Sequence, residues 1–128
     1  MLYNSSLFSP PCPAIEVELQ NPVLNATTIQ TIAQIDTGAD YCAIPITIVS
    51  QLNLMPYRHN NFNNHDGTQS LQEVFRIKVS ITHLPVLNLD AIYLPFLDRE
   101  TYIILGREAL NTWLMLLDGP AQEFTVDV

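Results

Sequence analysis

Two stretches near the start of the chain alternate apolar and polar residues. Residues 14–20 put an apolar side chain at every second position, which is typical of a strand with one buried face. Residues 27–35 are rich in β-branched side chains and predict a second strand. Asn21-Pro22 interrupts the pattern between them, so we expect the two strands to form a hairpin.

A short apolar run and a helical pattern follow. Residues 41–44 predict a buried strand. Pro45 suits the first turn of a helix, because proline has no amide hydrogen to lose there, and residues 46–54 can supply about two turns. The sequence therefore predicts a strand that leads directly into a short helix.

The centre of the chain changes character. Residues 56–70 are polar and rich in asparagine, with Asp66-Gly67 as a hairpin-turn signal. Residues 75–81 alternate cleanly and predict the returning strand. We expect 58–78 to form a long hairpin with its exposed tip near Asp66-Gly67.

The last third predicts a strand, a turn, a buried strand that ends in glycine, a short helix and a final strand. Their ranges are 86–94, 97–100, 102–106, 107–114 and 123–128. Many short strands with one short C-terminal helix indicate an all-β, barrel-like fold. We assign residues 14–128 to a single domain, and we expect the proline-rich residues 1–13 to be a flexible lead-in.

Composition narrows the choice of partners. The 128 residues carry a net charge of −8, and the five basic residues form no cluster, which argues against nucleic acid as a partner. We expect no membrane partner, since no stretch approaches the ~20 apolar residues that span a bilayer. Cys12 and Cys42 are too few for a disulfide framework, and no signal peptide is evident, so we expect a cytoplasmic protein with reduced thiols.

Asp36 is the strongest candidate for chemistry. It ends the second predicted strand and is followed by Thr37, Gly38 and Ala39. A carboxylate held on a tight turn among small residues suits acid-base chemistry on an extended ligand. Asp, Thr and Gly are also ordinary turn residues, so the motif alone is only suggestive.

A second motif makes the first one more specific. Ile104-Leu105-Gly106 followed by Arg107 comes about seventy residues after Asp36-Thr37-Gly38-Ala39-Asp40, with the polar hairpin between them. In this order the chain resembles the retropepsin-like aspartic proteases, from about Ile15 to the C-terminus. The closing Leu117-Asp118-Gly119-Pro120 resembles bacterial-type members more than retroviral ones. The resemblance implies a closed barrel with a flap hairpin, a polypeptide substrate and no cofactor.

The resemblance also implies roles for individual residues near the catalytic turn. Asp36, Thr37 and Gly38 form the catalytic motif, in which Thr37 stiffens the paired turns. Ala39 and Asp40 line the groove and contact substrate main chain.

Two further groups of residues take their roles from the same resemblance. Gly106 permits close packing beneath the turn, and Arg107 pairs with a carboxylate, for which Asp40 is the best candidate. His65, Asp66 and Gly67 belong to the flap that closes over the substrate. Their polar character departs from the glycine-rich, apolar flap of retroviral members.

The chemistry gives an independent argument for a homodimer. Hydrolysis without a metal or a nucleophilic side chain needs a general base and a general acid. Two close carboxylates can share one proton and do both. The chain has a single Asp-Thr-Gly, so the second Asp36 must come from another copy related by a two-fold axis. Such a dyad favours activity below neutral pH.

Other interpretations remain open. The chain could be a non-catalytic dimerisation or peptide-binding domain that keeps the fold, or a precursor in which residues 1–13 must be removed. His59, His65 and His83 lack the spacing of metal ligands, so we expect no metal site. Trp113 is best explained as part of a helix core or a dimer contact.

Overall fold

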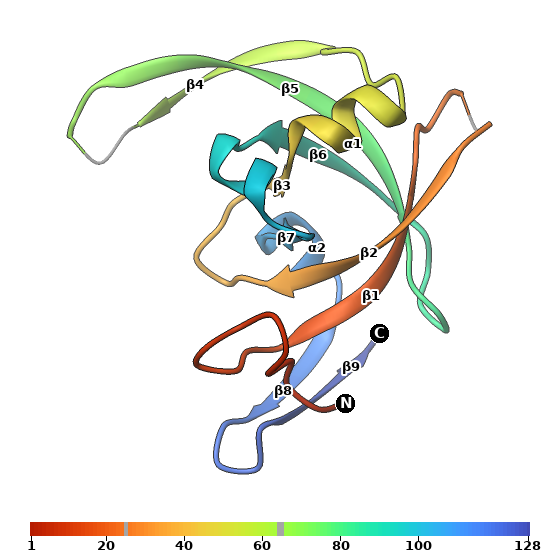
Figure 1. Cartoon of the computed structure of the whole chain (residues 1–128), viewed down its shortest axis with the longest axis vertical. Helices are drawn as coiled ribbons and strands as arrows, with labels where there is room; N and C mark the ends of the chain where they lie inside the picture. Colours follow the sequence, from red (N-terminus) through yellow and green to blue (C-terminus); the bar gives the residue numbers. More distant parts are fainter. Residues whose placement is uncertain (25, 64–65) are drawn as a thin grey trace.

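Strands wrap around a hydrophobic core in the computed structural model, which describes residues 1–24, 26–63 and 66–128. Figure 1 shows the arrangement of the elements along the chain. The strands and helices are β1 (Ala14–Gln20), β2 (Thr28–Ile35), β3 (Cys42–Ile44), α1 (Ile46–Gln51), β4 (Arg58–Asn63), β5 (Gln69–Ser80), β6 (Leu87–Tyr93), the 3₁₀ helix η1 (Pro95–Arg99), β7 (Tyr102–Leu105), α2 (Arg107–Leu110), β8 (Leu114–Asp118) and β9 (Glu123–Asp127).

Six of the strands in the described part of the chain close into a barrel. Their order is β1-β2-β7-β3-β6-β5, and pairing of β1 with β5 closes the ring. The β1–β2 hairpin is antiparallel, as expected, with Ala14 opposite Gln34. The pairs β2–β7 and β3–β6 are parallel. The sequence-based prediction of an all-β barrel is therefore confirmed.

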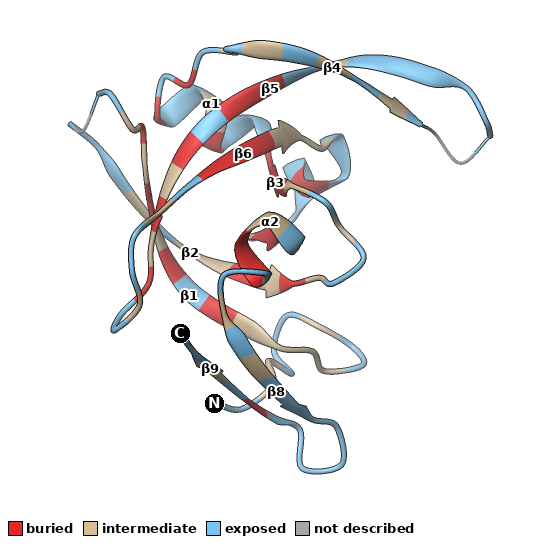
Figure 2. Ribbon diagram, turned by 180° about the vertical axis from the view of Figure 1, so that it is seen from behind, coloured by how far each residue is buried: buried red, intermediate tan, exposed pale blue. Residues whose placement is uncertain are grey.

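The core lies inside this ring. The inward side chains of the alternating strands are almost completely buried, as for Val17 and Leu19 on β1 and for Ile77 and Val79 on β5. Figure 2 shows the buried residues following the strands around the barrel, with exposed residues on the outer parts of the β4–β5 hairpin. Burial of alternate apolar residues explains why the period of two predicted these strands correctly.

The long hairpin predicted over 58–78 is present as β4 and the first half of β5. Its register runs from Arg58 opposite Val74 to Asn63 opposite Gln69. Beyond Val74, β5 continues into the barrel and pairs with β6. One strand of 12 residues thus serves both the barrel and the hairpin, and Figure 1 shows the hairpin projecting beyond the barrel.

The predicted helix over 107–114 is wrong in its second half. The helix α2 ends at Leu110, and Leu114–Asp118 form strand β8 instead. β8 pairs with β9 along its whole length, from Leu114 opposite Asp127 to Asp118 opposite Glu123. A short apolar run suits either structure, and pairing with a distant strand decided the outcome. The helix predicted over 46–54 is shorter as well, and Pro45 is its N-cap residue.

The N-terminal residues contact the β8–β9 hairpin. The Tyr3 amide donates to the Gln122 carbonyl oxygen at 2.8 Å, and the Phe124 amide donates to the Met1 carbonyl oxygen at 2.8 Å. Asn4 and Cys12 form an isolated bridge. The expectation of a flexible lead-in over 1–13 did not anticipate these contacts. Among the residues described, no helix is long and apolar enough to cross a membrane.

Candidate active site

The turn after β2 carries the candidate catalytic residue. The Asp36 amide donates to the Leu105 carbonyl oxygen of β7 at 3.1 Å, which fixes the start of the turn to the barrel. The Ala39 amide donates to the Asp36 carbonyl oxygen at 3.3 Å, and the Gly38 amide donates to Asp36 Oδ1 at 2.9 Å. Asp36 is half-buried, whereas Thr37 and Gly38 are exposed. The turn therefore presents a held carboxylate at the surface of the single chain.

Gly106 lies directly beneath this turn. A Cβ atom on Gly106 would lie 2.6 Å from the Tyr41 carbonyl oxygen and 2.7 Å from the Ala39 carbonyl oxygen. These distances leave no space for any side chain, because the neighbouring atoms belong to the backbone. The close approach predicted for Gly106 from the family resemblance is therefore present.

The residues after Gly106 bind the far side of the turn. The Arg107 amide donates to the Ala39 carbonyl oxygen at 2.8 Å, and the Glu108 amide donates to the Asp40 carbonyl oxygen at 3.2 Å. The Arg107 guanidinium forms the expected ion pair with the Asp40 carboxylate, and it also donates to the Thr37 carbonyl oxygen at 3.2 Å. Backbone and side chain of Arg107 therefore hold the turn on both sides of Gly38.

The predicted flap residues lie at the tip of the β4–β5 hairpin, apart from His65, which lies outside the described residues. The Thr68 amide and hydroxyl donate to Asp66 Oδ1 at 3.0 and 2.6 Å, and both bonds lower the pKa of Asp66. Gly67 has φ of 83°, a conformation that favours glycine. The tip is thus a stabilised turn.

The hairpin meets the Asp36 turn through residues that the sequence analysis did not single out. The ring of Phe62 on β4 lies edge-on to the ring of Tyr41, with centroids 5.7 Å apart. The Arg58 guanidinium carbon is 6.0 Å from the centroid of the same Tyr41 ring. Tyr41 directly follows Asp40, so the contact joins the hairpin to the turn that carries Asp36.

A buried carboxylate at the base of the hairpin was also missed. Asp90 on β6 is only 6% exposed and accepts hydrogen bonds from Tyr57, Arg58 and Arg76, the last at 2.8 Å. Its amide donates to both carboxylate oxygens of Glu108 at 3.3 Å. These five residues are called the Asp90 cluster below.

The two carboxyl groups of the Asp90 cluster have pKa values shifted in opposite directions. Burial alone would raise the pKa of Asp90, but hydrogen bonds from Tyr57, Arg58 and Arg76 hold it below the usual value. Burial raises the pKa of Glu108, and the nearby charge of Asp90 adds to that effect. Arg76 and Asp90 are direct cross-strand partners, so an opposite-charge pair at this register was the available sequence signal.

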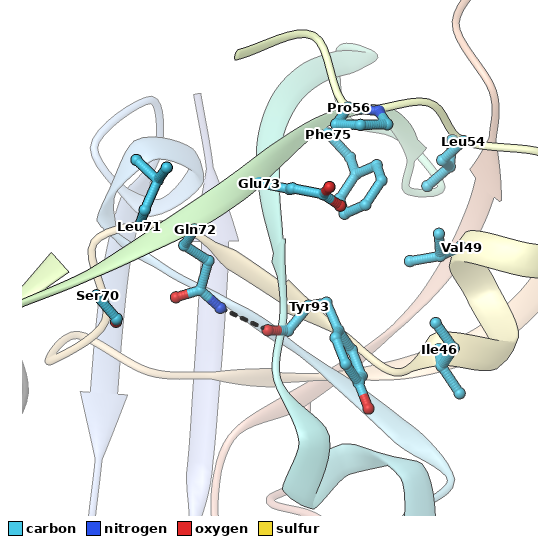
Figure 3. A pocket seen from close by; sticks show the side chains of 10 residues that line it. All are labelled: Ile46, Val49, Leu54, Pro56, Ser70, Leu71, Gln72, Glu73, Phe75 and Tyr93. Atoms are coloured by element: carbon cyan, nitrogen blue, oxygen red, sulfur yellow. Dashed lines mark hydrogen bonds between the residues drawn. The ribbon is translucent and has the colours of Figure 1, made fainter. Parts of the chain in front are cut away.

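A pocket of about 520 Å³ lies beside the hairpin base, between β5, α1 and the end of β6 (Figure 3). The Gln72 side-chain amide donates to the Tyr93 carbonyl oxygen at 2.8 Å across it. Phe75, Val49 and Leu54 supply much of its apolar wall. None of its lining residues comes from the Asp36 turn, so the pocket is separate from the candidate catalytic carboxylate.

The described residues hold no obvious metal site. Over 1–24, 26–63 and 66–128, no three His, Cys, Asp or Glu side chains are grouped so that they could bind a metal ion. Cys12 and Cys42 are both free, and Cys42 is buried on β3. Burial, together with the charge of Glu108, raises the pKa of the Cys42 thiol to about 12.

The barrel with its projecting hairpin has the fold of the retropepsin-like aspartic proteases. A solved retropepsin-like aspartic protease from Rickettsia conorii matches 98% of this chain and 86% of its own, with a TM-score of 0.60 and 15% identity. The EIAV protease, solved with an inhibitor, matches 88% of this chain and 93% of its own, with a TM-score of 0.52 and 18% identity. No family model matches the chain. No curated protein is significantly similar to it in sequence.

Proposed function

We propose that this protein is an aspartic endopeptidase that cleaves extended polypeptides as a homodimer. The observation that carries the proposal is the Asp36 turn within a retropepsin-like barrel. The Asp36 amide donates to Leu105 of β7, and the Arg107 side chain binds Thr37 and Asp40 in the same turn. A carboxylate on a turn held this way is pre-positioned, which is what acid-base catalysis requires.

Two Asp36 carboxylates would share one proton across the two-fold axis, because two like charges at close range do not both ionise. The ionised member takes a proton from a water molecule, and the water oxygen attacks the peptide carbonyl carbon. The protonated member donates its proton to the developing oxyanion. Collapse of the tetrahedral intermediate then breaks the C–N bond: the amine leaves with a proton from one carboxyl group of the dyad, and one hydroxyl of the intermediate returns its proton to the other carboxylate as the new carboxyl product forms.

The residues around Asp36 would hold the substrate. Thr37 and Gly38 are exposed. The Gly38 amide and the Thr37 carbonyl oxygen already have partners within the turn, so the Thr37 amide and the Gly38 carbonyl oxygen are the main-chain groups that would bind an extended chain or the partner turn. Asp40 is exposed although it pairs with Arg107, so its carboxylate can also accept a bond from substrate main chain. The β4–β5 hairpin, including His65, Asp66 and Gly67, would close over the bound chain and exclude water.

The sequence supplies only one Asp-Thr-Gly, so a second copy is needed to complete the site. Strand β8 offers a surface for it. Leu114 and Leu116 lie on one face of β8 and are 71% and 67% exposed. In the described part of the chain β8 pairs with β9, and its other edge has no partner strand. Exposed leucines along an open strand edge favour pairing with another chain.

The first test is the substitution Asp36→Asn, which keeps the shape of the side chain and removes its charge. We expect loss of cleavage of an unfolded protein substrate by at least ~10³-fold, since general acid-base catalysis by the dyad is lost. Unfolding midpoint and dimer mass should stay near wild type. Cleavage is measured between pH 3 and 7 by mass spectrometry of the peptides produced.

Glu100→Gln is a matched control, because Glu100 is an exposed carboxylate beyond η1. It should cleave like the wild type. Cleavage by purified Asp36→Asn at the wild-type rate would reject the proposed mechanism. If the wild type binds peptides but cleaves none at any pH, the protein is instead a peptide-binding domain with a protease fold.

A further inference from the structure

Tyr41 lies between two residues of the hairpin strand β4. The Phe62 ring centroid is 5.7 Å from the Tyr41 ring centroid, and the Arg58 guanidinium carbon is 6.0 Å from it. Arg58 and Phe62 are four positions apart on a strand, a span of about 13 Å at ~3.3 Å per residue. A single ring on the catalytic turn therefore contacts β4 near both of its ends.

The burial pattern shows which face of β4 makes this contact. Arg58, Asn60 and Phe62 are half-buried, while the intervening residues His59, Asn61 and Asn63 are exposed. Alternate residues of a strand point to opposite sides. The face that carries Arg58 and Phe62 is thus turned toward the Asp36 turn, and the other face is turned to solvent.

The two contacts differ in how firmly their β4 residue is held. Arg58 is fixed at the base by the carboxylate of Asp90 and by the hydroxyl of Tyr57, to which it donates at 2.9 Å. Hydrogen bonds to Tyr57, Asp90 and Tyr41 hold the pKa of Arg58 above its usual value. Phe62 lies further along the hairpin, where β4 pairs only with β5 among the described residues. The Tyr41–Phe62 contact therefore links the outer part of β4 to the Asp36 turn.

We propose that Tyr41 is the docking residue of the hairpin: its ring holds β4 over the Asp36 turn through Phe62, with Arg58 as the fixed end. Tyr41 and Phe62 are then positioning residues, and the hairpin opens when their rings separate. As part of an enzyme this inference rests on the proposed function, because closure would enclose a polypeptide beside Asp36.

The opening equilibrium can be measured without any substrate. Aromatic pairs of this geometry contribute roughly two- to tenfold to an equilibrium constant. We expect Phe62→Ala to speed amide hydrogen exchange in β4 and in residues 69–73 by about that factor. Exchange in β1 and β2 should not change. Phe62→Trp, which restores an aromatic ring, should return exchange to near the wild-type rate.

Asn61→Ala is the matched control, since Asn61 lies on the solvent face of the same strand. It should exchange like the wild type. Tyr41→Leu provides a second variant that removes the ring from the other partner, and adding Phe62→Ala to Tyr41→Leu should speed exchange no further, because the ring pair is already lost. Wild-type exchange in Phe62→Ala, or equal acceleration in Asn61→Ala, would overturn the inference.

Peptidase kinetics give a second readout. Phe62→Ala should raise KM by two- to tenfold, while kcat changes less, because a hairpin that closes less often binds substrate more weakly. If no cleavage is found but the exchange results hold, the docking role stands and the proposed function fails. If cleavage depends on Asp36 but hydrogen exchange is insensitive to Phe62→Ala, the proposed function stands and the docking role of Tyr41 fails.

Discussion

Gly106 shows how one position can determine the shape of the candidate site. Three backbone atoms, from Tyr41, Ala39 and Asp40, would lie within 2.9 Å of a Cβ atom at this position. The turn that carries Asp36 and the start of α2 can pack together only because this residue has no side chain. The amide of the next residue, Arg107, then reaches the Ala39 carbonyl oxygen.

Gly106→Ala should destabilise the protein by about 3 kcal/mol, the upper part of the range for overpacked sites, because backbone atoms cannot move aside as a side chain can. The rate of peptide cleavage should also fall, by at least the factor that about 3 kcal/mol represents, because the Asp36 turn must shift. Urea unfolding and peptide cleavage measure the two effects. Gly119→Ala is the matched control: nothing lies within 4 Å of its added Cβ, so it should cost little. Equal stability of the two variants would contradict the packing argument.

At the scale of elements, the Asp90 cluster ties four parts of the chain together. Arg58 starts β4, Arg76 is on β5, Asp90 is on β6 and Glu108 is in α2. Glu108 follows Arg107, so the cluster is one residue away from the ion pair that holds the Asp36 turn. The base of the hairpin and the support of the turn are therefore connected through Asp90.

Asp90→Asn should cost about 3 kcal/mol at pH 7, because two arginines would lose a buried partner. The pKa of Asp90 is lower in the folded protein than its ordinary value of 3.8, so its ionised form stabilises the fold above that pH. This stability is lost as the pH falls through the folded pKa. The difference between variant and wild type should thus shrink below pH 3.8.

Denaturant unfolding at pH 7 and pH 2.5 tests this dependence. Asp127→Asn, at the exposed end of β9, should show no comparable change between the two pH values. If Asp90→Asn lowers the free energy of unfolding equally at both pH values, the charge of Asp90 is not what stabilises the cluster.

The alternating strands and the Asp36 turn could be predicted because they depend on local pattern and short motifs. Alternation of apolar and polar residues predicted β1 and the inner part of β5, and β-branched residues predicted β2. The Asp66-Gly67 turn signal predicted the β4–β5 hairpin, and the family resemblance gave the Asp40–Arg107 pair. Two features depend on partners far away in the sequence. β8 is a strand because it pairs with β9, and Asp90 is buried because Tyr57 and two arginines cover it. A local pattern carries neither kind of information.

At the scale of the whole molecule, the exposed leucines of β8 and the single Asp-Thr-Gly both bear on whether two copies of the chain form a dimer. A lone chain leaves Asp36 half-buried at an open surface and leaves Leu114 and Leu116 largely exposed. Figure 1 shows the β8–β9 hairpin at the bottom of the molecule, the β4–β5 hairpin along the top and the β1–β2 turn at the upper right. In the proposed homodimer, the second copy covers the β8–β9 hairpin and supplies the second carboxylate of the dyad.

Leu116→Glu should weaken the dimer by at least tenfold, because an unpaired charge would be buried in the interface, and cleavage at low protein concentration should fall with it. Analytical ultracentrifugation over a concentration series measures the dissociation constant. Val23→Glu, at an 84% exposed position near the β1–β2 turn, is the control and should leave both properties unchanged. A dimer unaffected by Leu116→Glu would place the interface elsewhere.

The Asp36 amide bonds to Leu105, and the following turn packs on Gly106 and Arg107. The conformation of the Asp36 turn therefore depends on residues that are synthesised about seventy positions later. During translation, a nascent chain still lacking β7 and α2 has only the hydrogen bonds within the Asp36 turn and lacks the contacts from Leu105, Gly106 and Arg107 that hold the turn in place. Assembly of so many contacts between distant segments is also inherently slow. A growing polypeptide on the ribosome could therefore not complete the Asp36 turn before residues 105–107 have been made, which would delay any peptidase activity until that point.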